Sequence, residues 1–193
     1  GKAACVICPD VIPEKYNYFA RQTDHVSRDD ATVVAVDVAD KRLLGGLEEE
    51  FGDIVDLNID HHISNVRFAK NLFLDADAAA TAESMYELLG IMKVNINDVT
   101  AKALYTGIAT DTGCFKYSNV TAKTHMIVAQ LYEYNIGAPE INRIMFDTKS
   151  RKLLELERMV LDASEFHFGG KCILLPVTAE MQEKTGCSGT ELE

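Results

Sequence analysis

The sequence contains no apolar run long enough to cross a membrane and no excess of basic residues. A transmembrane helix needs about 20 consecutive apolar residues, so we expect no membrane-bound segment. The 193 residues include 19 Lys and Arg against 30 Asp and Glu, a formal net charge of -11. Because duplex nucleic acid is bound through many basic side chains, duplex DNA is not an expected partner. A small phosphorylated substrate is still compatible with this charge, since bound metal cations would reverse it locally.

The sequence also lacks the even number of regularly spaced cysteines that is typical of a disulfide scaffold. The five cysteines are scattered along the chain, which favours a reducing, cytoplasmic setting. Cys5 and Cys8 form a C-x-x-C pair, a spacing that also occurs in redox and zinc sites. We expect no such chemistry here, because residues 3–7 have the composition of a strand, and residues three apart on a strand face opposite sides.

No Pro/Gly/Ser-rich linker, internal repeat or low-complexity segment divides the chain. Apolar segments of strand length instead alternate with helical patterns over the first 75 residues. This alternation predicts an α/β fold with a mostly parallel sheet covered by helices. We expect strands at residues 3–8, 32–37, 53–60 and 71–74, and helices at 13–21 and 47–51.

The remainder of the chain is predicted to be helical as far as residue 163. Asn97 and Thr121 have the residue types of helix N-caps. We expect these helices at residues 78–92, 97–110, 121–134, 139–146 and 150–163. A β-hairpin over 165–177 and a helix over 179–184 are expected to follow. We therefore predict one domain over residues 1–149, a linker helix over 150–163 and the beginning of a second α/β domain over 164–193.

Polar residues follow apolar segments at three places, and these places are the candidate site. Asp37 ends one predicted strand, Asp60, His61 and His62 end the next, and Asp111 follows a helix. Open α/β sheets bind ligands outside the carboxyl ends of their strands. Carboxylates together with neutral imidazoles are ligands for Mn, Zn or Fe. Taken singly, each could be an ordinary turn residue, but taken together they favour a metal site.

A two-metal phosphoryl-transfer centre needs oxygen ligands, some nitrogen ligands and an open position for water. Asp37, at the end of a central strand, could bridge two ions. His61 and His62 are adjacent, and adjacent side chains on an extended chain point apart. We therefore predict that one binds metal while the other faces the substrate phosphate or the leaving group. Asp60 is expected to orient an imidazole.

Other polar residues near these motifs are expected to have no chemical role. Ser64 and Asn65 are expected to shape their loop. A further set is expected to form turns or caps or to be solvated, namely Arg42, Asp75, Asp77 and Glu83.

Four segments, in this order, resemble motifs of the DHH phosphoesterases, most closely the bacterial nano-RNase and 3′-phosphoadenosine-5′-phosphate (PAP) phosphatase group. They are VDVADKR at residues 36–42, DHHISN at 60–65, AATAES at 79–84 and TGIATDTGCF at 106–115. The resemblance implies an α/β phosphoesterase that uses two divalent ions, most often Mn²⁺, at a site between two domains. It implies that Asp37 bridges the ions, that His61 and Asp111 each bind one, and that His62 contacts the substrate phosphate.

The sequence also departs from the family pattern. The family's first metal motif, a His and two Asp, and the Gly-His-rich motif of its C-terminal domain are both missing, and Lys116 stands where arginine is frequent. We therefore expect a fragment of a longer protein, truncated at both ends, that retains roughly half of the metal ligands and is inactive alone.

Three functions remain open at this point. The first is a phosphoesterase acting on short oligoribonucleotides or PAP, so that the expected partners are short RNA or nucleotides, with a homodimer as one candidate state. The second is a cyclic-dinucleotide phosphodiesterase. The third is a degenerate module kept for binding or regulation, which the absent first motif would favour.

Overall fold

The computed structural model describes residues 3–19, 26–27 and 31–187. The chain divides into two compact units, Gly1–Phe146 and Asp147–Glu193, and each is described by itself. The end of the helix predicted at 13–21 lies outside the described residues.

The first unit is built on a sheet of three parallel strands in the order β1-β2-β3. The strands are β1 (Val34–Val36), β2 (Leu57–Asp60) and β3 (Asn71–Leu74). Ala35 pairs with Asn58, and Ile59 pairs with Phe73. The prediction of a parallel sheet in an α/β fold is confirmed. Because parallel strands end at the same edge, residues that follow β1 and β2 are neighbours in space.

The predicted strand at residues 3–8 does not form. Its side chains are exposed, with Val6 at 76% and Ile7 at 55% of their full accessible surface. A strand is stabilised by pairing and packing against a neighbouring strand, and an apolar composition supplies neither. The prediction of a strand at residues 3–8 was therefore wrong, because it relied on composition alone.

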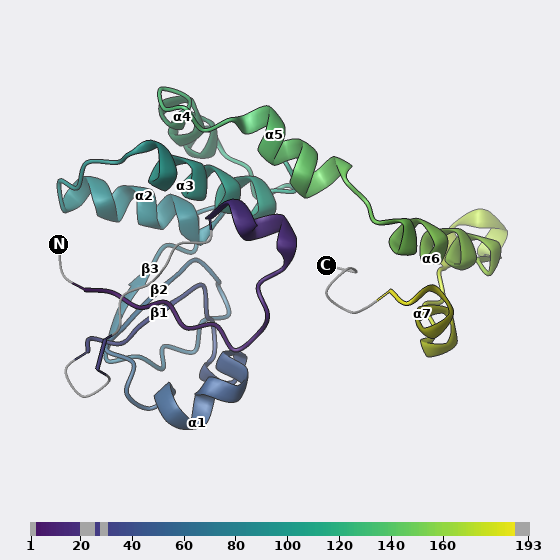
Figure 1. Cartoon of the computed structure of the whole chain (residues 1–193), viewed down its shortest axis with the longest axis horizontal. Coiled ribbons are helices and arrows are strands. Elements are labelled where there is room, and N and C mark those ends of the chain that lie inside the picture. The colour runs from purple at the N-terminus through teal and green to yellow at the C-terminus, as the bar shows by residue number, and fades with distance from the viewer. Residues whose placement is uncertain (1–2, 20–25, 28–30, 188–193) are drawn as a thin grey trace. The chain divides into compact units, whose positions relative to one another are not determined.

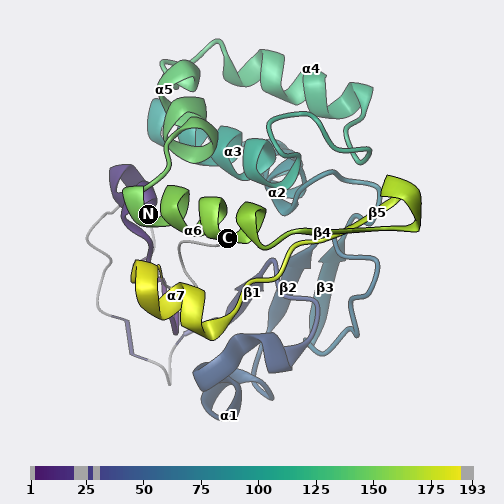
Figure 2. The same ribbon diagram turned by 90° about the vertical axis from the view of Figure 1, so that its right-hand side faces the viewer.

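The sheet lies between the short helix α1 and the longer helices of this unit. Figures 1 and 2 both show the sheet between α1 on one side and the pair α2 and α3 on the other. The 3-10 helix η3 (Lys41–Leu47) leads directly into α1 (Glu48–Phe51). The 3-10 helix η1 (Glu14–Phe19) lies instead against α3 (Figure 1), where the Tyr18 and Thr106 hydroxyl oxygens are 3.1 Å apart. The helix predicted at 13–21 is thus a 3-10 helix over its described part.

The long helices enclose the main hydrophobic core, with α3 at its centre. They are α2 (Thr81–Ile91), α3 (Asp98–Asp111), α4 (Ala122–Leu131) and α5 (Ala138–Asn142), which continues into the π-helix η4 (Arg143–Asp147). Helix α3 contacts α2, α4 and α5, and its buried residues include Leu104, Tyr105 and Ile108. Both predicted caps are confirmed, since the side chains of Asn97 and Thr121 accept hydrogen bonds from the first turns of α3 and α4.

Gly107 allows α2 and α3 to approach closely. A Cβ atom at this position would lie 2.8 Å from the Cβ of Ala82 on α2, which is closer than carbon atoms normally pack. The close approach matters for the site, because Asp111 ends α3 and Thr81 begins α2.

The second unit contains α6 (Arg151–Asp162), β4 (Glu165–His167), the 3-10 turn η5 (Phe168–Gly170), β5 (Cys172–Leu174) and α7 (Ala179–Thr185). The two strands pair antiparallel, and α6 contacts α7. The predicted hairpin is therefore present, while its assignment to a second domain stays a prediction. Within the described residues of both units, every helix is too short or too polar to span a membrane.

Replacement of Ile108 by alanine tests the central role of α3. Ile108 has no exposed surface, so Ile108→Ala removes buried methyl groups and leaves a cavity. We expect the free energy of unfolding, measured by urea denaturation, to fall by about 2–4 kcal/mol. Val99→Ala, at a partly exposed position of the same helix, is the control and should cost less than about 0.5 kcal/mol. Equal losses for the two variants would contradict the assignment of the core.

Lys123 connects α4 to the β3–α2 region through two ion pairs. Its Nζ lies 2.9 Å from Asp75 Oδ2 and 2.9 Å from Glu87 Oε1. The hydrogen bond from Lys123 is the main reason that the pKa of Asp75 is lowered. A carboxyl with a lowered pKa stabilises the fold above its ordinary pKa, and this stabilisation is lost as the pH falls through the lowered value.

We therefore expect Lys123→Met to reduce the free energy of unfolding by about 0.5 kcal/mol at pH 7, since the pair is partly exposed. The difference from the parent chain should shrink as the pH falls through the lowered pKa of Asp75. Urea denaturation at a series of pH values measures it. A difference that stays constant down to pH values well below the ordinary pKa of Asp would show that the effect is packing rather than charge.

Candidate metal centre

Three segments that are far apart in the sequence bring their polar side chains together at the edge of the sheet. Asp37 follows β1, His61 follows β2, and Asp111 ends α3. The Nε2 atom of His61 lies 3.8 Å from Asp37 Oδ1 and 3.5 Å from Asp111 Oδ2. Ligand atoms bound to one ion at about 2.0–2.2 Å are roughly 3–4.4 Å apart. The distances from His61 Nε2 to each carboxylate therefore fit groups that bind a shared divalent cation.

Asp37 is held in a strained backbone conformation. Its φ is 62°, in the left-handed region, which residues other than glycine adopt at a cost of about 1–3 kcal/mol. Its N–H donates to Ile59 O at 2.9 Å, and its Oδ1 accepts a hydrogen bond of 2.6 Å from the Thr81 hydroxyl. The first residue of α2 thus fixes a carboxylate that follows β1.

His61 is oriented by a backbone carbonyl. Its Nδ1 lies 3.0 Å from the carbonyl oxygen of Ala78, a contact that requires the proton to be on Nδ1. The lone pair of Nε2 then faces the carboxylates of Asp37 and Asp111. A lone pair between two acceptors is unfavourable without a cation, but it is the arrangement that a cation binds, and metal-binding histidines commonly donate their other N–H to a carbonyl.

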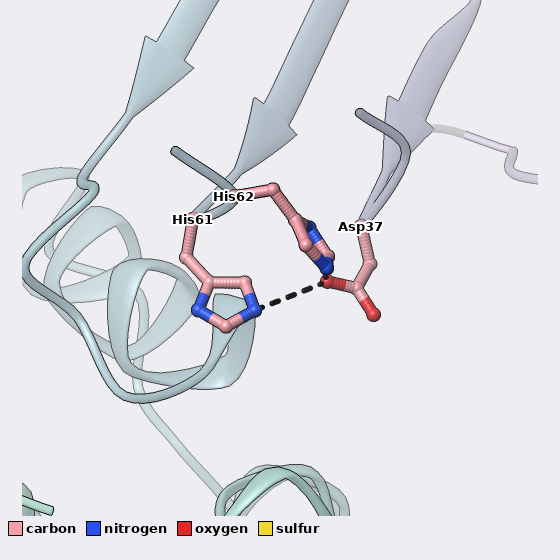
Figure 3. Close-up of side chains that lie close together, drawn as sticks. All are labelled: Asp37, His61 and His62. Atoms are coloured by element: carbon pink, nitrogen blue, oxygen red, sulfur yellow. Dashed lines mark ion pairs between the residues drawn. The ribbon is translucent and has the colours of Figure 1, made fainter. Parts of the chain in front are cut away.

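His62 does not point away from His61, contrary to the prediction. The two ring centroids are 4.5 Å apart, and Nδ1 of His62 lies 3.8 Å from the same oxygen of Asp37. Figure 3 shows both rings directed toward this carboxylate. The prediction assumed an extended chain, but β2 ends at Asp60, so the alternation of a strand no longer applies. Ligand atoms of Asp37, His61 and His62 all lie within 4.8 Å of one another.

Asp60 lies beneath the histidines and is fully buried. Its Oδ1 accepts from His62 Nδ1 at 2.7 Å and from the His61 N–H at 2.8 Å, and its Oδ2 accepts from Asn65 Nδ2 at 2.5 Å. Burial raises the pKa of Asp60, but the hydrogen bonds from Asn65 and His62 outweigh it and keep the pKa below its usual value. The hydrogen bond to Asp60 in turn raises the pKa of His62.

Asn65 supports this arrangement in addition to shaping its loop. Its Nδ2 also lies 2.7 Å from Oδ1 of the buried Asn58, and its own Oδ1 accepts from the Arg67 N–H at 2.7 Å. Asn58 belongs to β2. The loop after β2 is therefore tied back to the strand that carries Asp60.

The surroundings of Asp111 disfavour its negative charge. Burial raises its pKa, and the nearby negative charge of Asp37 raises it further, while His61 and His62 act in the opposite direction. A bound cation would reverse both unfavourable effects. The carboxylates of Asp37 and Asp111 also line a pocket of about 390 Å³, whose other walls are mainly apolar side chains of α2 and α3.

Several residues differ from their predicted environments or were given no role. Glu83 was predicted to be a turn, cap or solvated residue but is fully buried, and within the described part of the chain its carboxylate oxygens have no hydrogen-bond partner. Helix α2 begins at Thr81 rather than at the predicted residue 78. Thr81 and Asn119 contact the site but were given no individual role, although Thr81 lies within the AATAES segment that carries the family resemblance.

Comparisons with known proteins identify relatives over most of the chain. No family model matches the sequence. The protein named bifunctional oligoribonuclease and PAP phosphatase NrnA from Thermus thermophilus is 36% identical over 157 residues, which are 81% of this chain and 46% of that protein. The Bacillus subtilis protein of the same name is 27% identical over 135 residues, 68% of this chain and 43% of that protein. The chain thus spans about half the length of the curated relatives it matches.

A solved structure shows the same fold. An exopolyphosphatase-related protein from Bacteroides fragilis superposes with a TM-score of 0.81 at 23% sequence identity, covering 96% of this chain and 59% of that chain. At this level of identity the similarity supports the fold alone. The sequence relatives, the shared fold and the four ordered motifs together show that the chain belongs to the DHH phosphoesterase family, in the group whose curated members are named oligoribonuclease and PAP phosphatase.

Proposed function

We propose that this chain carries the metal centre of a phosphoesterase that hydrolyses short oligoribonucleotides or PAP in the cytoplasm. The observation that carries the proposal is the position of His61 Nε2, 3.8 Å and 3.5 Å from the carboxylates of Asp37 and Asp111. The substrate class comes from the names of the relatives. Because the chain spans about half the length of these relatives, the activity is proposed for a protein of their full length.

Asp37, His61 and Asp111 are the residues that would hold metal, and we propose a pair of Mn²⁺ ions with Asp37 as the bridging ligand. Carboxylate and imidazole together are suited to a divalent transition metal. When bound, such ions lower the pKa of a water molecule and polarise phosphoryl oxygens. Thr81 and the carbonyl of Ala78 hold two of these ligands in place before any ion arrives.

His62 is proposed to contact the substrate phosphate. Its hydrogen bond to the buried carboxylate of Asp60 raises its pKa and favours the protonated ring. A protonated imidazole attracts a phosphate anion and can give a proton to the leaving oxygen. The side chain is 44% exposed, so a substrate can reach it.

Replacement of the proposed bridging ligand tests the metal centre. Asp37→Asn removes the charge but keeps an acceptor for Thr81 and a residue type that tolerates a positive φ. In the full-length protein, we expect Mn²⁺-dependent phosphate release from PAP to fall on the order of 1,000-fold, because metal catalysis contributes several kcal/mol. The unfolding midpoint should change little. Asp53→Asn, at a side chain that is 87% exposed, is the matched control.

Activity of Asp37→Asn within a few-fold of the parent would reject the bridging role. Measured on the full-length protein, turnover of PAP, a diribonucleotide and cyclic di-AMP separates the remaining functions. A strong preference for cyclic di-AMP would favour the cyclic-dinucleotide phosphodiesterase. Tight Mn²⁺ binding without turnover of any of the three would favour a binding or regulatory module.

A further inference from the structure

Asn119 links two segments of the metal centre through one side-chain amide. Its Nδ2 donates to the carbonyl oxygen of Ala79 at 3.0 Å and to that of Asp111 at 3.2 Å. Ala79 precedes α2, and Asp111 ends α3. The amide of asparagine has two N–H donors, and here each is used by a different element.

Both carbonyls lie beside groups of the proposed metal site. Ala79 directly follows Ala78, whose carbonyl accepts from His61 Nδ1, and Asp111 is itself a proposed ligand. The hydrogen bonds therefore run from His61 through residues 78–79 and Asn119 to Asp111. The contact between His61 Nε2 and Asp111 Oδ2 at 3.5 Å closes this ring.

We propose that Asn119 is a positioning residue that sets the spacing between His61 and Asp111 for metal binding. The inference rests on the proposed function, because it assumes that these two residues share an ion. Asn119 needs no contact with the metal or the substrate for this role. It holds the backbone on either side of the site at a fixed separation.

The chain reaches Asn119 through a strained turn. Gly113, Cys114 and Phe115 follow α3 with φ values of 54°, 56° and 64°, and left-handed residues other than glycine cost about 1–2 kcal/mol each. Buried Thr112 stabilises the turn, since its hydroxyl oxygen accepts from the Phe115 N–H at 3.1 Å. The turn reverses the chain and returns Asn119 to the end of the helix that it has just left.

A simpler role for Asn119 is to cap α3. The last carbonyls of a helix lack partners within it, and the nearby ones are satisfied by the backbone, since Thr112, Gly113 and Cys114 donate to them. Capping explains the bond to Asp111 O. It does not explain the second bond to Ala79 O on a different segment, and the two roles have different consequences for metal binding.

Two substitutions separate these roles, with Mn²⁺ binding to the full-length protein measured by isothermal titration calorimetry. Asn119→Leu keeps the size of the side chain and removes both donors. Asn119→Asp also removes both donors but adds a negative charge near the site. We expect each variant to bind Mn²⁺ about 10–100-fold more weakly, the range for residues that orient metal ligands. The rate of phosphate release from PAP at saturating Mn²⁺ should stay within a few-fold of that of the parent protein.

Asn135→Leu is the matched control. Asn135 is exposed, and its backbone N–H, which the substitution preserves, donates to Asp98 at the opposite end of α3. Unchanged Mn²⁺ affinity in Asn119→Leu with a lower unfolding midpoint would show capping only and overturn the inference. Tighter Mn²⁺ binding by Asn119→Asp would show that the added negative charge matters more than the spacing of His61 and Asp111. That result would also overturn the inference. A parent protein that neither binds Mn²⁺ nor cleaves PAP would instead reject the proposed function itself.

Discussion

The site depends on the electrostatic relation between one imidazole nitrogen and two carboxylates. With its proton fixed on Nδ1 by Ala78 O, His61 directs a lone pair at Asp37 and Asp111. The two carboxylates also repel each other, and burial together with the charge of Asp37 raises the pKa of Asp111. A divalent cation bound between these groups would offset this repulsion. The site is therefore costly in the metal-free chain in the way expected of a preformed metal-binding site.

Strand pairing and helix packing, which do not depend on a metal, hold these groups together despite this cost. Parallel pairing of β1 and β2 places Asp37 and His61 at one edge, and close packing of α2 on α3 at Gly107 brings Thr81 and Asp111 to the same place. The left-handed conformation of Asp37 is retained because its N–H and its carboxylate are both hydrogen-bonded. Strain is thus concentrated at Asp37, while the surrounding pairing and core packing are regular.

The sequence predicted the elements whose signals are local, together with their convergence at a strand edge. The caps at Asn97 and Thr121 follow from residue type alone, and strand-end polarity indicated Asp37 and His61. The strand at residues 3–8 was wrong because pairing depends on a partner. The burial of Glu83 depends on tertiary packing around α2. The roles of Thr81 and Asn119 depend on contacts between residues far apart in the chain, since Asn119 meets Ala79 across a separation of 40 and Thr81 meets Asp37 across 44.

The two adjacent histidines differ chemically because their Nδ1–H groups donate to different acceptors. His61 donates to the neutral carbonyl of Ala78, which fixes its tautomer without adding charge, so the ring is suited to bind a cation. His62 donates to Asp60, a buried carboxylate whose charge is maintained by hydrogen bonds, and the same contact raises the pKa of the ring. A protonated ring repels a metal and attracts a phosphate. The difference in role that the family resemblance implies for these neighbours therefore has a physical basis in a carbonyl on one side and a carboxylate on the other.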